Sequence, residues 1–122
     1  MISLVEKSKP ALADLCRRFR VRRLYLFGSA AAARFDPKAS DLDFLVEMSD
    51  RRPTATYADR YLGLAEALER LLGRRVDLIT EQSIRNPYLQ REVEATRQLV
   101  YEQRGEETRP LKVTLADSKL PT

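Results

Sequence analysis

Histidine and tryptophan are absent from this chain of 122 residues, and cysteine occurs once, as Cys16. The lack of histidine excludes Ser-His-Asp and Cys-His catalysis, histidine-ligated zinc and imidazole acid–base chemistry. A single cysteine cannot form an intrachain disulfide and favours a reducing compartment, and its place on an apolar helix face predicts a packed core thiol. Any catalysis must therefore use carboxylates, hydroxyls, lysine or arginine, and any metal ion should prefer oxygen ligands.

Long apolar runs are also missing. None approaches the roughly 18 residues that span a bilayer, and the N-terminus lacks the basic-then-apolar order of a signal peptide. We therefore expect a cytoplasmic chain with no membrane association. Lysine and arginine number 22 against 18 acidic residues, a net charge of +4 with opposite signs mixed. This balance favours an anionic ligand or partner but does not predict direct nucleic-acid binding.

The apolar pattern alternates between helical and strand periods and predicts a single α/β domain over residues 1–104. Its architecture should be a small mixed β-sheet with helices packed on it, and the last strand should lie at an edge of the sheet. Residues 105–122 carry scattered charges and no stable period, so we expect a flexible tail. The expected helices are 8–20, 30–33, 54–72 and a short one from 86 through 93, and the expected strands are 21–27, 41–47, 76–80 and 98–102.

Gly28 and Ser29 stand between a predicted strand and the start of a predicted short helix. Glycine lets another group approach the backbone closely, and a helix N-terminus offers unpaired N–H donors to a phosphate. The Ser29 hydroxyl adds a donor at the same place. An ordinary turn with a serine cap would use the same pair, so these two residues alone leave the choice open.

Asp41 and Asp43 begin the second predicted strand. Residues two apart on a strand share a face, so both carboxylates should project together while Leu42 and Phe44 face the core. Two negative groups on one face favour a bound cation, and Mg²⁺ suits them because it shares few carboxylates with substrate phosphates. A solvent-facing start of a strand is the alternative.

Asp77 is a lone carboxylate in the otherwise apolar third strand. If that strand neighbours residues 41–47, Asp77 would complete a triad of carboxylates as a metal ligand or as a general base. The alternative is a sheet-edge aspartate paired with Arg74 or Arg75.

Taken together, these residues resemble a known family. Gly28-Ser29, a short spacer, Asp41-x-Asp43 and a later aspartate on its own strand, Asp77, are similar to the nucleotidyltransferases of the DNA polymerase β superfamily, and most to the minimal nucleotidyltransferase (MNT) branch. The resemblance covers residues 8–104. It departs from the branch where Ala32-Ala33 stand in place of the usual Arg-Gly, with Arg34 two positions later.

The resemblance implies a magnesium-dependent transfer of AMP from ATP to a hydroxyl. In that case Asp41, Asp43 and Asp77 would be catalytic and metal-binding, and Gly28 and Ser29 would bind the nucleotide. It also implies a partner, a HEPN-domain ribonuclease toxin for which such a chain is the antitoxin, with a tyrosine as the expected acceptor. A partner that brings its own acceptor suits a chain of this length.

Three alternatives stay open on the sequence. One is nucleotidyl transfer to a small molecule, although the enzymes that do this usually carry a further domain for the acceptor. Another is an antitoxin that neutralises its partner by binding alone, with vestigial carboxylates. The third is nucleic-acid binding through the arginine pairs Arg51-Arg52 and Arg74-Arg75, which lack interleaved aromatic residues for base stacking.

Overall fold

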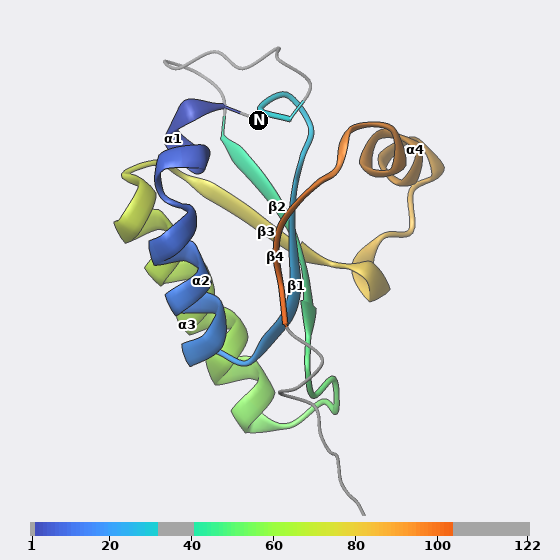
Figure 1. Ribbon diagram of the computed structural model, residues 1–122. Coiled ribbons are helices and arrows are strands. Elements are labelled where there is room, and N and C mark those ends of the chain that lie inside the picture. The colour runs from blue at the N-terminus through green and yellow to red at the C-terminus, as the bar shows by residue number, and fades with distance from the viewer. Residues whose placement is uncertain (1, 32–40, 104–122) are drawn as a thin grey trace, which may run out of the picture.

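The computed structural model describes residues 2–31 and 41–103 (Figure 1). Four strands form one mixed sheet in the order β3-β2-β1-β4, in which β2 and β3 are parallel and the other neighbours antiparallel. The mixed α/β sheet and the edge position of the last strand confirm the sequence prediction. The elements in chain order are α1 (Ser3–Lys7), α2 (Lys9–Arg18), β1 (Val21–Phe27), β2 (Leu42–Met48), α3 (Ala55–Leu72), β3 (Val76–Thr80), the 3₁₀ turn η1 (Glu81–Ser83), α4 (Pro87–Thr96) and β4 (Gln98–Glu102).

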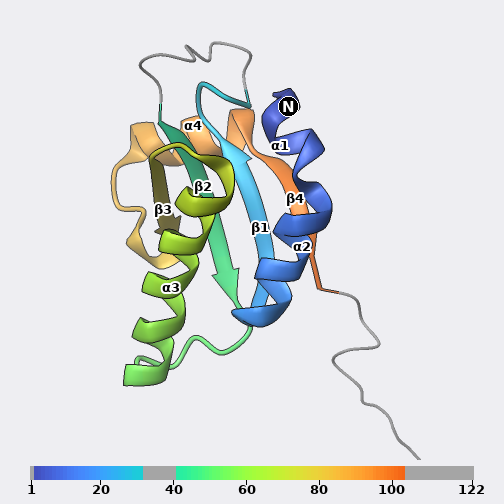
Figure 2. The ribbon, with the colours of Figure 1, turned by 90° about the vertical axis from the view of Figure 1, so that its left-hand side faces the viewer.

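Helices cover the two faces of the sheet unequally. Helices α1, α2 and α3 lie on one face, and η1 and α4 lie on the other (Figures 1 and 2). Side chains alternate along β2, so Phe44 and Val46 enter the larger core under α1–α3, whereas Leu45 packs with Phe27 and Val93 beneath α4. The odd-numbered residues of β2, including Asp43, therefore belong to the α4 face.

Helix α3 provides the crossover between the parallel strands β2 and β3, and both of its ends are marked in the sequence. The Thr54 hydroxyl accepts a hydrogen bond from the Tyr57 N–H at 3.1 Å and caps the first turn. Gly73 ends the helix in the left-handed region, at φ 67°. These two signals explain why the predicted span 54–72 is confirmed to within one residue.

The predicted N-terminal helix 8–20 is confirmed as α2, which has Ser8 at its N-cap and ends two residues early, but the helix before it, α1, was not predicted. The structure has two helices that meet at Ser8, and the second ends at Arg18. Helix α1 is too short to show a period in the sequence, yet it places Val5 in the core with no exposed surface. Cys16 is fully buried, as expected, and burial raises the pKa of its thiol to about 12.

Two predicted segments fall wholly or partly outside the described residues. Ala30 and Ala31 follow Gly28 in a turn, and the rest of the predicted helix 30–33 lies outside the described ranges, as do Arg34 and the predicted tail 105–122. Within residues 2–31 and 41–103, no helix combines the length and the apolar character needed to cross a membrane.

Candidate active site

The sheet brings the predicted site residues to one end of the α4 face. Strand β1 runs antiparallel to β2, so Phe27, which precedes the Gly28 turn, pairs with Asp43. Strand β3 runs parallel to β2, and its Asp77 is the register partner of the same Asp43. The sequence made Asp77 a candidate only if its strand neighbours the strand of Asp43. The pairing of β2 with β3 meets this condition.

Gly28 and Asp43 fit against each other. Gly28 has φ 76°, a conformation that side chains disfavour. A Cβ atom at this position would stand 2.6 Å from Asp43 Oδ2, which is closer than a Cβ atom approaches a non-bonded oxygen. Glycine is therefore favoured here both by its backbone angle and because it leaves room for the Asp43 carboxylate.

Asp43 is half-buried among other carboxylates. Burial raises its pKa to about 6, and the negative charges of Asp77, Asp41 and Glu92 add to the rise. Like charges at this density favour either a proton or a cation. A bound cation beside Asp43 would therefore offset this charge as well as a proton does.

Asp41 lies directly before β2, and its carboxylate accepts a hydrogen bond from Arg75 at 3.4 Å. Both side chains are well exposed, 42% for Asp41 and 83% for Arg75, so this ion pair can open at little cost. Asp77 is exposed on the edge strand β3. Arg75, which the sequence offered as an ion-pair partner for Asp77, is instead paired with Asp41 in this structure.

The carboxylates suit a magnesium ion that takes part of its coordination from the substrate. Among the described residues, no three acidic, histidine or cysteine side chains stand together closely enough to hold a metal ion by themselves. Mg²⁺ is usually bound through one or two carboxylates together with water and substrate phosphates, not by a closed protein cage. The donor set around Asp43 fits a cation that is completed by a phosphate ligand.

Helix α4 contributes two residues that the sequence analysis did not identify. The Thr96 hydroxyl accepts a hydrogen bond from the Gly28 N–H at 2.9 Å. Glu92, one turn earlier, has its Oε2 atom 3.6 Å from where a Gly28 Cβ would stand. No local pattern distinguishes these residues from the other polar residues of α4, because their proximity to Gly28 arises from tertiary packing alone.

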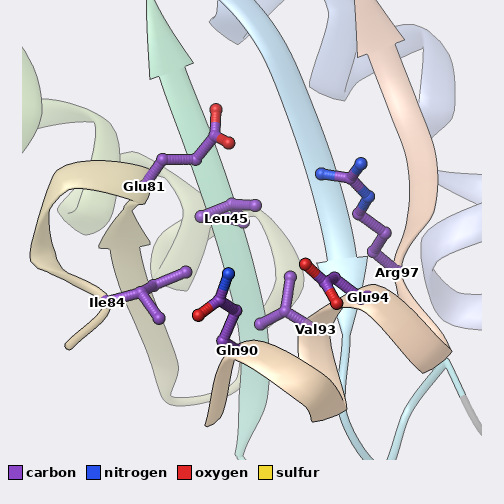
Figure 3. Close-up of a pocket in the computed structure, with 7 residues that line it drawn as sticks. All are labelled: Leu45, Glu81, Ile84, Gln90, Val93, Glu94 and Arg97. Carbon is purple, nitrogen blue, oxygen red and sulfur yellow. The ribbon is translucent and has the colours of Figure 1, made fainter. Parts of the chain in front are cut away.

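A cavity of about 190 Å³ also opens on the α4 face (Figure 3). Its α4 residues recur at helical spacing on one side of the helix, while Glu92 and Thr96 lie on another side, toward Gly28. The cavity therefore lies beside the carboxylate site and is not part of it. It is lined by Leu45, Glu81, Ile84, Gln90, Val93, Glu94 and Arg97.

Comparisons with known proteins agree with this geometry. The model of the nucleotidyltransferase domain family matches residues 9–100. A relative from Methanocaldococcus jannaschii, named "putative protein adenylyltransferase", is 38% identical over 91 residues, which is 75% of this chain and 85% of the relative. A solved structure described as a "putative minimal nucleotidyltransferase" is 33% identical with a TM-score of 0.54, covering 75% of this chain and 88% of that one.

Toxin–antitoxin structures share the fold at lower identity. One, solved with AMP-PNP, has a TM-score of 0.59 at 22% identity and covers 81% of this chain and 77% of its own. Another, a tri-AMPylated Shewanella oneidensis HEPN toxin in complex with an MNT antitoxin, has a TM-score of 0.56 at 20% identity and covers 84% and 76%. With the family match over most of its length and relatives above 30% identity, this chain belongs to the nucleotidyltransferase domain family, in its minimal branch, and is a nucleotidyltransferase.

Proposed function

We propose that this nucleotidyltransferase transfers AMP from ATP, with magnesium, to a tyrosine hydroxyl of a partner HEPN ribonuclease toxin in the cytoplasm, and so acts as its antitoxin. The observation that carries the proposal is the packing of the Gly28 turn against Asp43, with Asp77 in register beside it. The names of the M. jannaschii relatives support protein as the acceptor. The HEPN–MNT complex that shares the fold supports the partner.

The proposed roles follow from the geometry. Asp41 and Asp43 would hold Mg²⁺, which when bound offsets their charge and that of the triphosphate. Asp77, exposed on the edge strand, would act as general base and could also contact the metal ion. The acceptor oxygen forms a bond to the α-phosphorus, the bond from that phosphorus to the pyrophosphate oxygen breaks, and the hydroxyl proton passes to Asp77.

The Gly28 turn would hold the triphosphate, but not through the N–H of Gly28. That N–H already donates to Thr96, so the phosphate donors must be the half-buried Ser29 hydroxyl and the backbone groups that follow it. The role of Gly28 is then to leave space beside Asp43, which brings the phosphate-binding turn and the metal-binding carboxylate into contact.

Asp77→Asn tests the role of the third carboxylate. The assay follows label from α-labelled ATP to the purified partner, and calorimetry measures the affinity for ATP with magnesium. We expect affinity within a few-fold of wild type and a loss of transfer of about 10²–10⁴-fold, the usual contribution of a general base. Loss of binding and transfer together would identify Asp77 as chiefly a metal ligand, and full activity would overturn both roles.

Asp50→Asn is the matched control, because Asp50 pairs with Arg52 beyond the far end of β2. It should leave binding and transfer unchanged.

The metal-bridged site predicts much weaker ATP binding without magnesium, and equal affinity with and without magnesium would contradict the proposal. Two results together would show an antitoxin that acts by binding alone. The wild type would transfer no label to the partner, and the Asp43→Asn variant would still inhibit the partner fully.

A further inference from the structure

A chain of hydrogen bonds ties the Gly28 turn to helix α4. The Gly28 N–H donates to Thr96 Oγ1 at 2.9 Å, and the Thr96 hydroxyl donates in turn to the backbone oxygen of Glu92 at 2.7 Å. The hydroxyl thus acts as acceptor and donor at once, which fixes its orientation. These hydrogen bonds link the end of β1 to the last turn of α4, two parts of the chain that are far apart in sequence. Asp43 of β2 joins this arrangement because it lies against Gly28.

The turn needs such a link because its first residue is glycine. Glycine samples many backbone conformations, and the turn holds only one of them, with φ 76°. Gly28 is also buried, so its N–H would be left unsatisfied if the Thr96 oxygen were removed. One hydroxyl therefore both selects the turn conformation and satisfies a buried donor.

We propose that Thr96 is a positioning residue that holds the Gly28-Ser29 turn in the conformation that receives the nucleotide phosphates. It would act through Gly28 and contact neither the nucleotide nor the metal ion. This inference deepens the proposed function and rests on it, since it assigns to α4 a part in nucleotide affinity. It predicts that loss of the hydroxyl weakens ATP binding more than it slows the chemical step, because the carboxylates stay in place.

The test compares Thr96→Val, which has nearly the same shape but lacks the hydroxyl, with Thr96→Ser, which keeps it. In the label-transfer assay Thr96→Val should raise the KM for ATP by about fivefold to tenfold, as expected for one part-buried hydrogen bond, and change kcat less than about threefold. Thr96→Ser should stay within about twofold of wild type in both. A wild-type KM in Thr96→Val, or a loss confined to kcat, would overturn the inference.

Thr54→Val is the matched control for a purely structural threonine. The Thr54 hydroxyl caps α3 by accepting from the Tyr57 N–H at 3.1 Å, on the opposite face of the sheet from α4. Its loss should lower the Tm and leave the KM for ATP unchanged. A rise in KM in Thr54→Val equal to that in Thr96→Val would show that the effect is general destabilisation, which would also overturn the inference.

Hydrogen exchange at the Gly28 amide separates this inference from the proposed function. In the protein without nucleotide, Thr96→Val should speed that exchange at least about tenfold and Thr96→Ser should protect it as wild type does. If the wild type transferred no label, the proposed function would fail, while unchanged exchange in Thr96→Val would still overturn the link to α4. Faster exchange with unaltered ATP affinity would show that the link exists but does not position the turn, again overturning the inference.

Discussion

At the scale of single residues, Asp43 combines the conflicting demands of the site. It is half-buried, packs against Gly28 and faces the charges of Asp77, Asp41 and Glu92. Burial first, and then the three negative charges, disfavour the ionised form of Asp43 in the folded protein, whereas the unfolded chain ionises it freely. The charge that would suit a cation therefore destabilises the fold when no cation is bound.

This conflict predicts a pH-dependent effect of Asp43→Asn. The folded pKa of about 6 lies above the ordinary value of 3.8, so the folded state binds the proton more tightly than the unfolded state. Wild-type stability should therefore fall as pH rises from 3.8 to about 6 and then level off. In thermal melts without magnesium, the Tm advantage of Asp43→Asn should grow over this range and stay constant above it. A lower Tm for the variant at pH 7 would mark Asp43 as a structural hydrogen-bond acceptor instead.

Cys16 gives a second prediction at this scale. Full burial and a thiol pKa of about 12 leave almost no thiolate at pH 8. A colorimetric thiol reagent should therefore react very slowly with the native protein and rapidly in denaturant. Fast reaction under native conditions would show that helix α2 opens readily.

At the scale of elements, β1 and α3 are each followed directly by a glycine, and the two glycines have similar conformations but different surroundings. Gly28 and Gly73 have φ 76° and 67°. A Cβ atom on Gly73 would meet nothing within 4 Å, whereas one on Gly28 would collide with Asp43. The first glycine lies against a carboxylate of the candidate site, and the second lies in open space at the end of α3.

Alanine substitutions should separate these two effects. Gly73→Ala should lower the free energy of unfolding by about 1–2 kcal/mol, the cost of a left-handed residue with a side chain. Gly28→Ala should cost more, because the collision with Asp43 adds to the same backbone strain. Adding Asp43→Ala to Gly28→Ala should recover part of the difference in a double-mutant cycle measured by urea unfolding. Strict additivity would contradict the packing of Gly28 on Asp43.

The same elements show how far the sequence could predict the structure. Strands β1, β3 and β4 have the predicted limits, because apolar β-rich runs are bounded by turn and capping residues. Helix α1 could not be predicted, because it is too short to show a period and is held in place by burial of Val5. For the candidate site, the sequence pattern offered Asp43 and Asp77, which the sheet places in register, while the link from Thr96 to Gly28 depends on how α4 packs.

At the scale of the whole molecule, β4 is the last strand of the described residues, and it ends in specific contacts. Strand β4 pairs with β1, and Arg23 of β1 bridges Glu47 at 2.8 Å and Glu102 at 3.0 Å. The Gln103 N–H then donates to the Arg22 oxygen at 2.8 Å. The fold therefore depends on the chain at least as far as Gln103.

Truncation at two places tests this dependence. Removal of everything after Gln103 should change the free energy of unfolding by less than about 1 kcal/mol, because the sequence beyond it has no periodic apolar pattern. Removal of everything after Arg97 deletes β4 and should abolish cooperative unfolding. Circular dichroism melts of both chains give the comparison, and a collapse of the longer chain would show that Leu111, Val113 and Leu115 pack as a further strand.

The place of β1 between β2 and β4 also has a consequence for synthesis on the ribosome. One edge of β1 can pair with β2 as soon as β2 has been synthesised. The other edge must wait for β4, which begins about 70 residues after β1 ends. At roughly 5–20 residues per second, the nascent chain carries β1 as an open sheet edge for about 4 to 14 seconds. An unpaired edge is a template for pairing with another chain, so slow translation ahead of Gln98 should increase aggregation of the newborn protein.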